Sequence, residues 1–227
     1  MKTTLSDRQL IANLKKQLIE MGGHLGRLQF HAALAGNISA RVDCDQMLCT
    51  RSGADIGQLS AKDIVLCDLT GHCLGNGVLP TSEFAMHRAA YEERDDVGAV
   101  IHSHPPTATA FAAASAPLDA LMLPEMLVIL GPVALVPYAT PGTEDLAQRL
   151  RGFLPEHDAF LLENHGALTV GKDLTEAARR MELLEHNARI ALLVRNIGKP
   201  FALKPEDLKS LMDIRQRMRQ GVDKGSP

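Results

Sequence analysis

An apolar run that closes on two histidines places the strongest constraint on how this chain folds. Residues 98–101 lead directly into His102-Ser103-His104, and Pro105 follows. A short run bounded in this way is typical of a buried strand. Residues two apart on a strand face the same side, so His102 and His104 should present two imidazoles together. Two buried imidazoles are unfavourable without a shared ligand, which favours a metal site over packing.

Further candidate ligands lie in other parts of the chain. Another apolar run, 159–162, ends in Glu163-Asn164-His165-Gly166, and the segment Pro80-Thr81-Ser82-Glu83 stands where a helix is predicted to begin. Imidazole is the usual ligand of zinc and similar divalent metals, and catalytic zinc sites typically use three protein ligands and one open position. His165 and Glu83 are therefore candidates, although spacing alone does not show that they lie near His102.

The remaining pattern predicts a mixed sheet covered by helices, that is, an α/β fold. Periodicity predicts strands over 36–42, 47–50, 64–67, 97–104, 133–137, 159–162 and 166–170, and helices over 10–21, 82–94, 107–116, 143–153 and 173–195. We expect Gly22-Gly23 to stop the first helix, and Ser82 and Thr143 to cap the second and the fourth.

Size and composition favour one domain over 1–227, with 213–227 as a mobile tail. The net charge of −3 gives no reason to expect nucleic acid as a partner. No apolar stretch is long enough to span a membrane and no secretory signal opens the chain, so we expect no membrane association and a cytoplasmic protein. The four cysteines are interpreted as reduced packing residues.

Most other histidines are interpreted as structural or surface residues, which is the usual role of a lone histidine. This group comprises His24, His31, His72, His157 and His186. His87 differs because it lies one helical turn after Glu83 and can contact it. A packing role, or support for Glu83 from behind, is favoured there over direct chemistry.

Six short motifs, taken in order, resemble the class II aldolase/adducin family over roughly residues 10–198. They are Gly36-Asn37-Ile38-Ser39, Ser52-Gly53, Pro80-Thr81-Ser82-Glu83, His102-Ser103-His104-Pro105, Pro137-Tyr138-Ala139-Thr140 with Gly142-Thr143, and Glu163-Asn164-His165-Gly166. The resemblance implies a three-layer α/β/α sandwich around a mixed, largely antiparallel sheet. It also implies a homotetramer with active sites at subunit interfaces, and small ketose phosphates as substrates.

The same resemblance assigns roles to residues of this chain. His102, His104 and His165 become ligands of Zn²⁺, or of another divalent metal such as Mn²⁺ or Co²⁺. Glu83 either completes the coordination or acts as acid/base once substrate binds. The phosphate site falls on five residues with neutral donors: Asn37, Ser52, Gly53, Thr81 and Ser82. Backbone N–H groups at turns and at a helix N-terminus suit an anion, so we expect a phosphate pocket without a cation.

The chain departs from the aldolases of the family in its proton donors. Those enzymes use a tyrosine from a neighbouring subunit, whereas the corresponding segment here reads Leu123-Pro124-Glu125-Met126. Glu125 is therefore the second candidate acid/base, with a structural interface carboxylate as the alternative. The sequence predicts a zinc-dependent aldolase that works by retro-aldol cleavage through a metal-bound enediolate. A sugar-phosphate 4-epimerase, a dehydratase or a decarboxylase stays open, and an adducin-like interaction module is disfavoured because such modules lack the three histidines.

Overall fold

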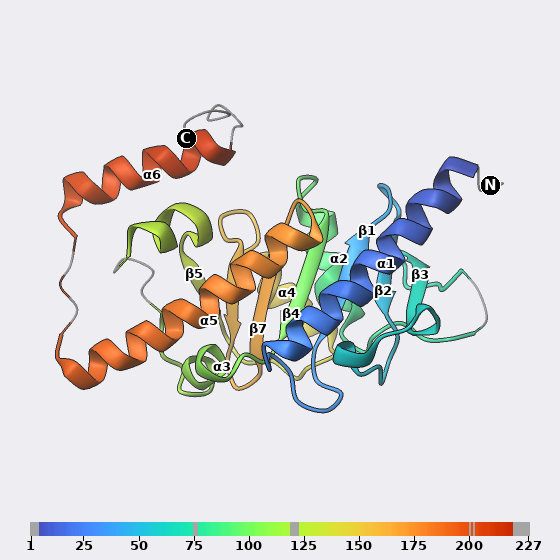
Figure 1. Cartoon of the computed structure of the whole chain (residues 1–227), viewed down its shortest axis with the longest axis horizontal. Helices are drawn as coiled ribbons and strands as arrows, with labels where there is room; N and C mark the ends of the chain where they lie inside the picture. The colour runs from blue at the N-terminus through green and yellow to red at the C-terminus, as the bar shows by residue number, and fades with distance from the viewer. Residues whose placement is uncertain (1–4, 75–76, 119–122, 200, 202, 220–227) are drawn as a thin grey trace.

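The computed structural model describes residues 5–74, 77–118, 123–199, 201 and 203–219, which form one seven-stranded sheet (Figure 1). The strand order is β3-β2-β1-β4-β7-β6-β5. The strands are β1 (Asn37–Arg41), β2 (Gln46–Thr50), β3 (Ile64–Asp68), β4 (Ala99–Ser103), β5 (Val133–Val136), β6 (Ala159–Leu162) and β7 (Gly166–Gly171). Within the described residues β5 and β6 pair in parallel and every other neighbouring pair is antiparallel, which confirms the mixed sheet.

Helices cover both faces of the sheet, so the predicted three-layer α/β/α sandwich is confirmed (Figure 1). One face packs against α1 (Leu5–Arg27), α3 (Pro106–Ala113) and α5 (Leu174–Ile197), and the other against α2 (Phe84–Glu93) and α4 (Glu144–Arg151). Strand β4 feeds both cores in alternation: Ile101 belongs to the first core and Val100 to the second. His102 therefore lies on the α2 side of the sheet.

The prediction that Gly22-Gly23 ends the first helix is wrong, because α1 continues to Arg27. The reason for the glycine is close packing. A Cβ on Gly22 would lie 2.1 Å from the carbonyl oxygen of Ile56, in the short helix η1 (Ile56–Gln58). Tertiary contact thus overrides the local helix-stop signal at this position.

The predicted helix caps have mixed outcomes. Helix α2 begins at Phe84 with Glu83 as its N-cap residue, so Ser82 does not cap it. Thr143 is the N-cap residue of α4, but its hydroxyl donates to the carbonyl oxygen of Thr140 at 2.7 Å and makes no cap bond. The backbone therefore places Glu83, and not a capping serine, at the N-terminus of α2.

A helix that the sequence analysis did not predict, α6 (Pro205–Arg219), lies near the C-terminal end. It covers the first half of the expected tail, and its Arg215 is buried and donates to the carbonyl oxygens of Val128 and Ile129 at 3.1 and 3.2 Å. Those residues belong to the π-helical turn η4 (Met126–Leu130). Residues 220–227 lie outside the described residues.

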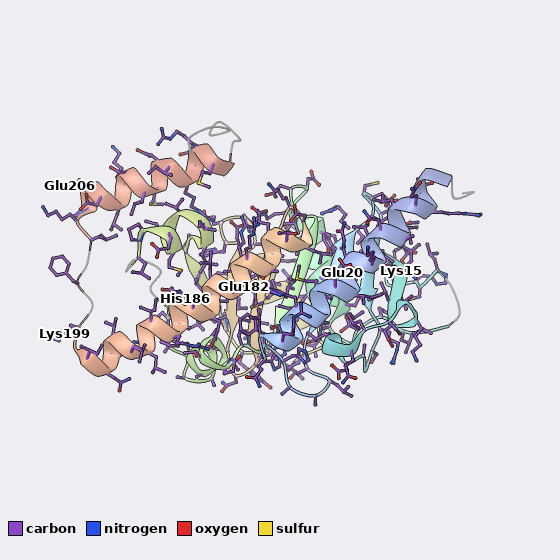
Figure 2. All side chains as sticks on the ribbon, viewed as in Figure 1. Lys15, Glu20, Glu182, His186, Lys199 and Glu206 are labelled. Atoms are coloured by element: carbon purple, nitrogen blue, oxygen red, sulfur yellow. The ribbon has the colours of Figure 1, made fainter. Side chains whose placement is uncertain are left out.

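Polar side chains lie on the outer surface of the helical layer. Figure 2 shows Lys15 and Glu20 projecting from α1, and Glu182 and His186 from α5. Among the described helices, none combines the length and apolar character needed to cross a membrane.

Candidate active site

Three histidines from two elements converge at one end of the sheet. His102 and His104 come from the end of β4, and His165 from the turn between β6 and β7. Their ring centroids lie 4.9 Å (His102 to His104), 4.6 Å (His102 to His165) and 5.2 Å (His104 to His165) apart. One ring nitrogen of each lies within 4.8 Å of the others, a spacing that one metal ion can bridge.

Two local backbone features bring His165 to the pair. Asn164 adopts a left-handed conformation (φ 52°), which lets the chain reverse sharply between β6 and β7. Gly166 then starts β7 directly beside His104, where a Cβ would lie only 2.5 Å from the His104 ring carbon Cδ2. A side chain at position 166 would therefore displace one of the candidate ligands.

Glu83 faces the histidines from the head of α2. Its Oε2 lies 3.1 Å from His102 Nε2 and accepts a hydrogen bond from Asn37 Nδ2 at 2.8 Å. Its Oε1 lies 3.1 Å from His165 Nε2, but not in hydrogen-bonding geometry. His102 Nδ1 lies 2.9 Å from the carbonyl oxygen of Ala167 and donates to it, which leaves the Nε2 lone pair directed at the centre.

The charges of the cluster suit a cation. Burial lowers the pKa of His104 from 6.5 to about 4, and a proton on the neighbouring His102 or His165 would lower it further, so the His104 imidazole is neutral at pH 7. Burial alone would raise the pKa of Glu83, but His102 and His165 outweigh it and hold that pKa well below its ordinary value. Neutral imidazole and ionised carboxylate are the forms that bind metals.

The donor set fits a divalent metal. Glu83 Oε1 is buried and accepts no hydrogen bond within the described part of the chain. A buried carboxylate oxygen without a donor is unfavourable, and a cation would satisfy it. Three imidazole nitrogens and one carboxylate oxygen suit zinc and also cobalt or manganese.

A cavity of about 240 Å³ opens beside the cluster. Four of the five predicted phosphate residues line it, together with Glu83, His104 and His165: Asn37, Gly53, Thr81 and Ser82. Backbone hydrogen bonds hold its two loops together, from Thr81 N to Thr50 O at 2.9 Å and from Ser52 N to Leu79 O at 3.1 Å. The Ser52 N–H is thereby already used, and Ser52 is absent from the cavity wall. Its hydroxyl contact with phosphate stays a prediction.

Arg51 also lines the cavity, so this cavity contains a cation that the predicted phosphate pocket did not include. Its Nε donates to Asp63 Oδ1 at 2.8 Å, and its Nη1 donates to the carbonyl oxygen of Ser52 at 2.9 Å. These two bonds leave further N–H groups of the guanidinium for an anion. The signal was present in the sequence, because Arg51 directly precedes Ser52-Gly53.

The structure does not bring Glu125 to the histidines. Glu125 is exposed at the start of η4, which leads into β5. Since β5 and β6 run in parallel with Val133 opposite Ala159, the start of β5 lies at the end of β6 remote from His165. Within one chain Glu125 and the histidines therefore occupy opposite ends of the sheet.

The chain is similar to several known proteins. The family described as "Class II Aldolase and Adducin N-terminal domain" matches residues 16–192. An L-fuculose phosphate aldolase of Methanococcus maripaludis is 35% identical over 162 residues, which are 71% of this chain and 87% of that protein. A 3-oxo-tetronate 4-phosphate decarboxylase of Haemophilus influenzae is 31% identical over 192 residues, 83% of this chain and 88% of that one.

A solved structure shows the same architecture. An L-fuculose 1-phosphate aldolase superposes with a TM-score of 0.83 at 32% identity. The match covers 91% of this chain and 96% of the other. The similarity therefore extends over the sheet, both helical layers and the segments that carry the histidine cluster.

Proposed function

Because the chain belongs to the class II aldolase and adducin family, we propose that it is a zinc-dependent lyase that cleaves a small ketose phosphate by a retro-aldol reaction. One observation carries the proposal: His102, His104, His165 and an ionised Glu83 converge beside a cavity lined by anion-binding groups. That combination suits a substrate with a carbonyl group at one end and a phosphate at the other.

Different residues along the cavity have different roles in this proposal. Arg51 and the neutral donors of Asn37, Gly53, Thr81 and Ser82 bind and orient the phosphate, with Ser52 adding its hydroxyl. A divalent ion held by the three histidines would supply a Lewis acid for the negative charge that develops on the substrate oxygens. Glu83, ionised and within reach of the same position, holds or moves a proton at the carbon next to the carbonyl.

Decarboxylation of a related keto-acid phosphate is the second candidate, and the tyrosines favour it. Retro-aldol cleavage needs a proton donor or acceptor at the oxygen of the departing aldehyde, whereas carbon dioxide leaves without one. The chain has two tyrosines. Tyr91 is buried and Tyr138 lies outside the wall of this cavity. A decarboxylase among the relatives is consistent with this reading.

A second copy of the chain would supply Glu125 in the aldolase reading. Glu125 lies far from the histidines of its own chain but is exposed, so a neighbouring subunit of a homotetramer can bring it to the site. A 4-epimerase would use the same arrangement and return the aldehyde to the enzyme-bound fragment.

A substrate panel tests the proposal. Zinc-loaded protein is incubated with ketose phosphates and keto-acid phosphates, while aldehyde, carbon dioxide and dihydroxyacetone phosphate are measured together. Equal release of aldehyde and dihydroxyacetone phosphate supports the aldolase. Carbon dioxide without aldehyde supports the decarboxylase. No product from any phosphate, with metal bound, would overturn both.

A further inference from the structure

A row of buried polar side chains runs behind Glu83, along the contact between β1 and α2. Asn37 and Ser39 on β1 face Glu83, His87 and Tyr91 of the α2 segment. All five are less than 10% exposed and lie beside the apolar core that α2 shares with the sheet. Buried polar groups need partners, and here they find them in one another.

The polar residues of β1 and α2 stay opposite one another because the two elements advance by similar distances per repeat. Two residues along a strand advance about 6.7 Å, and four residues along a helix advance about 6.0 Å. Positions 37 and 39 can therefore stay in register with positions 83, 87 and 91 over two helical turns. Arg41, the next residue on the same side of β1, donates to the carbonyl oxygens of Tyr91 and Arg94 at 2.6 and 2.9 Å and fixes the far end of the helix.

The hydrogen bonds form one unbroken chain. Tyr91 Oη lies 2.7 Å from Ser39 Oγ, and Ser39 Oγ lies 2.7 Å from His87 Nδ1. His87 Nε2 lies 2.5 Å from Asn37 Oδ1, and Asn37 Nδ2 lies 2.8 Å from Glu83 Oε2. The chain begins at a fully buried phenol and ends at the carboxylate of the active site.

Chemistry fixes the direction of every bond. Asn37 Nδ2 donates to Glu83 Oε2, so the amide turns its NH₂ group to Glu83 and its oxygen, which can only accept, to His87. His87 Nε2 must then carry the proton. Burial lowers the pKa of His87 to about 3, so the ring is neutral and Nδ1 accepts from the Ser39 hydroxyl. That hydroxyl can accept only from Tyr91, and all four donors point toward Glu83.

We propose that His87, held in its Nε2–H tautomer by Ser39 and Tyr91, is a positioning residue that orients Asn37 and through it the carboxylate of Glu83. The inference rests on the proposed function in assigning the proton transfer to Glu83. His87 is not among the residues that line the cavity and is not one of the three clustered histidines. Its contribution is to hold Glu83 Oε2 as an acceptor and to leave Oε1 directed at the centre.

Ring ¹⁵N NMR tests the chain without any substrate. Protein labelled with ¹⁵N-histidine is compared with His87→Gln to identify the His87 signals. We expect neutral His87 in the Nε2–H tautomer in the wild type, and a mixture of tautomers in Ser39→Ala because Nδ1 loses its donor. A cationic ring at pH 7, or a dominant Nδ1–H tautomer in the wild type, would overturn the proposal.

Kinetics on the substrate found in the panel test its consequence. His87→Leu should lower kcat roughly 10- to 100-fold, as loss of a group supporting an active-site residue does, while KM and zinc content stay within about threefold. His87→Gln keeps a donor for Asn37 and should recover most of the loss. The matched control is Thr169→Val, which removes a buried hydroxyl bonded to the carbonyl oxygen of Ala177 at 2.8 Å and should leave kcat unchanged.

Each outcome decides the question. If kcat is unchanged in folded His87→Leu, or falls equally in Thr169→Val, His87 is structural and the proposal fails. If His87→Leu does not fold, Ser39→Ala replaces it, and unchanged kcat in folded Ser39→Ala has the same meaning. If the wild type turns over no substrate, the proposed lyase fails, while the NMR result still decides whether the chain of hydrogen bonds exists.

Discussion

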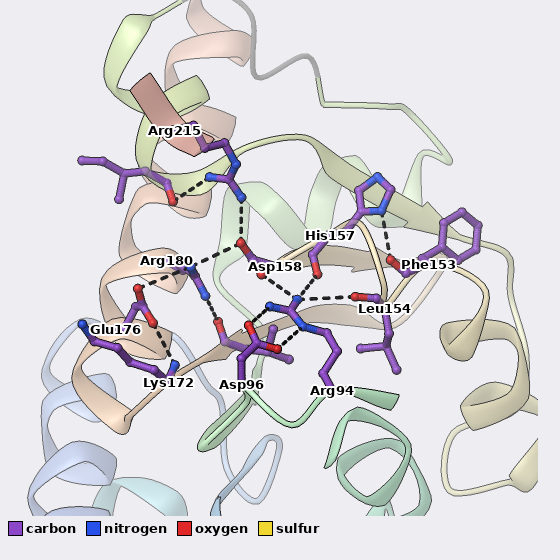
Figure 3. Close-up of polar contacts among 12 residues, drawn as sticks. Arg94, Asp96, Phe153, Leu154, His157, Asp158, Lys172, Glu176, Arg180 and Arg215 are labelled. Carbon is purple, nitrogen blue, oxygen red and sulfur yellow. Dashed lines mark hydrogen bonds and ion pairs between the residues drawn. The ribbon is translucent and has the colours of Figure 1, made fainter. Parts of the chain in front are cut away.

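Two buried ionic clusters occupy opposite ends of strand β6, and they differ in the source of the positive charge. Asp158 precedes the strand and His165 follows it. Figure 3 shows Asp158 surrounded by guanidinium groups. Its Oδ1 accepts from Arg94 Nη1 at 2.7 Å, and its Oδ2 lies 2.7 Å from Arg215 Nη2 and 3.2 Å from Arg180 Nη2. At this end the protein provides all of the positive charge itself.

The end of β6 that carries His165 brings together hydrogen-bond and metal-binding acceptors instead. Three imidazole nitrogens and the Glu83 carboxylate converge, and one carboxylate oxygen accepts no hydrogen bond from the described residues. A buried charge whose partners are complete is a structural element, whereas converging acceptors without a donor indicate a place for a ligand. The two clusters should therefore respond differently to metal, to mutation and to acid.

Removing a histidine should have the largest effect. His104→Ala takes one of three ligands, so bound zinc should fall from about one ion per chain to little, and turnover should be lost almost completely. Metal analysis of protein purified without chelator, together with turnover, measures this. The exposed His72 provides the control, because His72→Ala should keep both. Wild-type protein that carries no divalent metal and takes up none would break the comparison.

Removing the charge of Glu83 should affect turnover more than metal binding. Glu83→Gln is nearly isosteric and should lower kcat roughly 10²- to 10⁴-fold, the usual effect of losing a general acid/base. Zinc content should stay close to one ion per chain. Glu125→Gln, measured in parallel, tests whether that exposed carboxylate replaces the missing tyrosine. Near-normal turnover of Glu83→Gln would exclude Glu83 from the chemistry.

At the opposite end the expected loss is in stability. Asp158→Asn leaves Arg94, Arg180 and Arg215 facing a neutral amide, and breaking a buried ion pair in this way lowers the free energy of unfolding by about 3–5 kcal/mol. Urea denaturation measures it. Asp145→Asn removes an exposed ion pair with Arg149 and should change stability by less than about 1 kcal/mol. Loss of zinc from folded Asp158→Asn would mean that the clusters are not independent.

The sequence predicted the sheet and the histidine pair because both signals are local. Alternation along a strand places His102 and His104 on one side, whatever the rest of the chain does. The Asp158 cluster escaped prediction because two of its three arginines, Arg215 and Arg94, stand 57 and 64 residues away from it along the chain. Arg215 was assigned to a mobile tail on composition, since nothing nearby in sequence reveals its partner.

Close packing limited the prediction elsewhere. Gly22 has the pattern of a helix stop, but it packs against the backbone of Ile56. The reason for a glycine at this position therefore lies in a segment 34 residues away. The row of polar residues behind Glu83 could have been predicted from its spacing. Glu83, His87 and Tyr91 are four residues apart, which places them on one side of a helix, and Asn37 and Ser39 are two residues apart, which places them on one side of a strand. Only the pairing of α2 with β1 was missing. The domain boundaries and the roles of the site residues stay predictions.

Smaller effects are expected at the anion end of the cavity. Arg51→Gln and Ser82→Ala each remove one donor to the phosphate, so each should raise KM for a phosphorylated substrate by roughly tenfold, about 1.4 kcal/mol. KM for the unphosphorylated analogue should change little. Some loss of kcat is compatible with this idea, because remote binding energy also orients the reacting carbon. Equal changes for both substrates would place these residues outside the phosphate site.

The smallest expected effect is a difference between the two clusters in how acid changes their contribution to stability. The pKa of His104 falls from 6.5 to about 4 on folding, so between these values the unfolded chain binds more protons than the folded one. Stability must then decrease as the pH falls through this window. Arg94 stays charged throughout, because Asp96 and Asp158 raise its pKa even though burial opposes them. Between these pH values the histidine end should therefore weaken, while Arg94 at the other end keeps its charge.

Thermal denaturation with chelator present measures that difference. Between pH 7 and pH 5, Tm of His104→Gln should fall by about 2–4 °C less than Tm of the wild type, the shift expected for roughly 1 kcal/mol in a chain of this size. His72→Gln, altered at an exposed site, should follow the wild type. The buried His87 also has a lowered pKa, so some acid sensitivity should remain in His104→Gln. Parallel curves for all three proteins would show that burial of His104 does not govern the acid response.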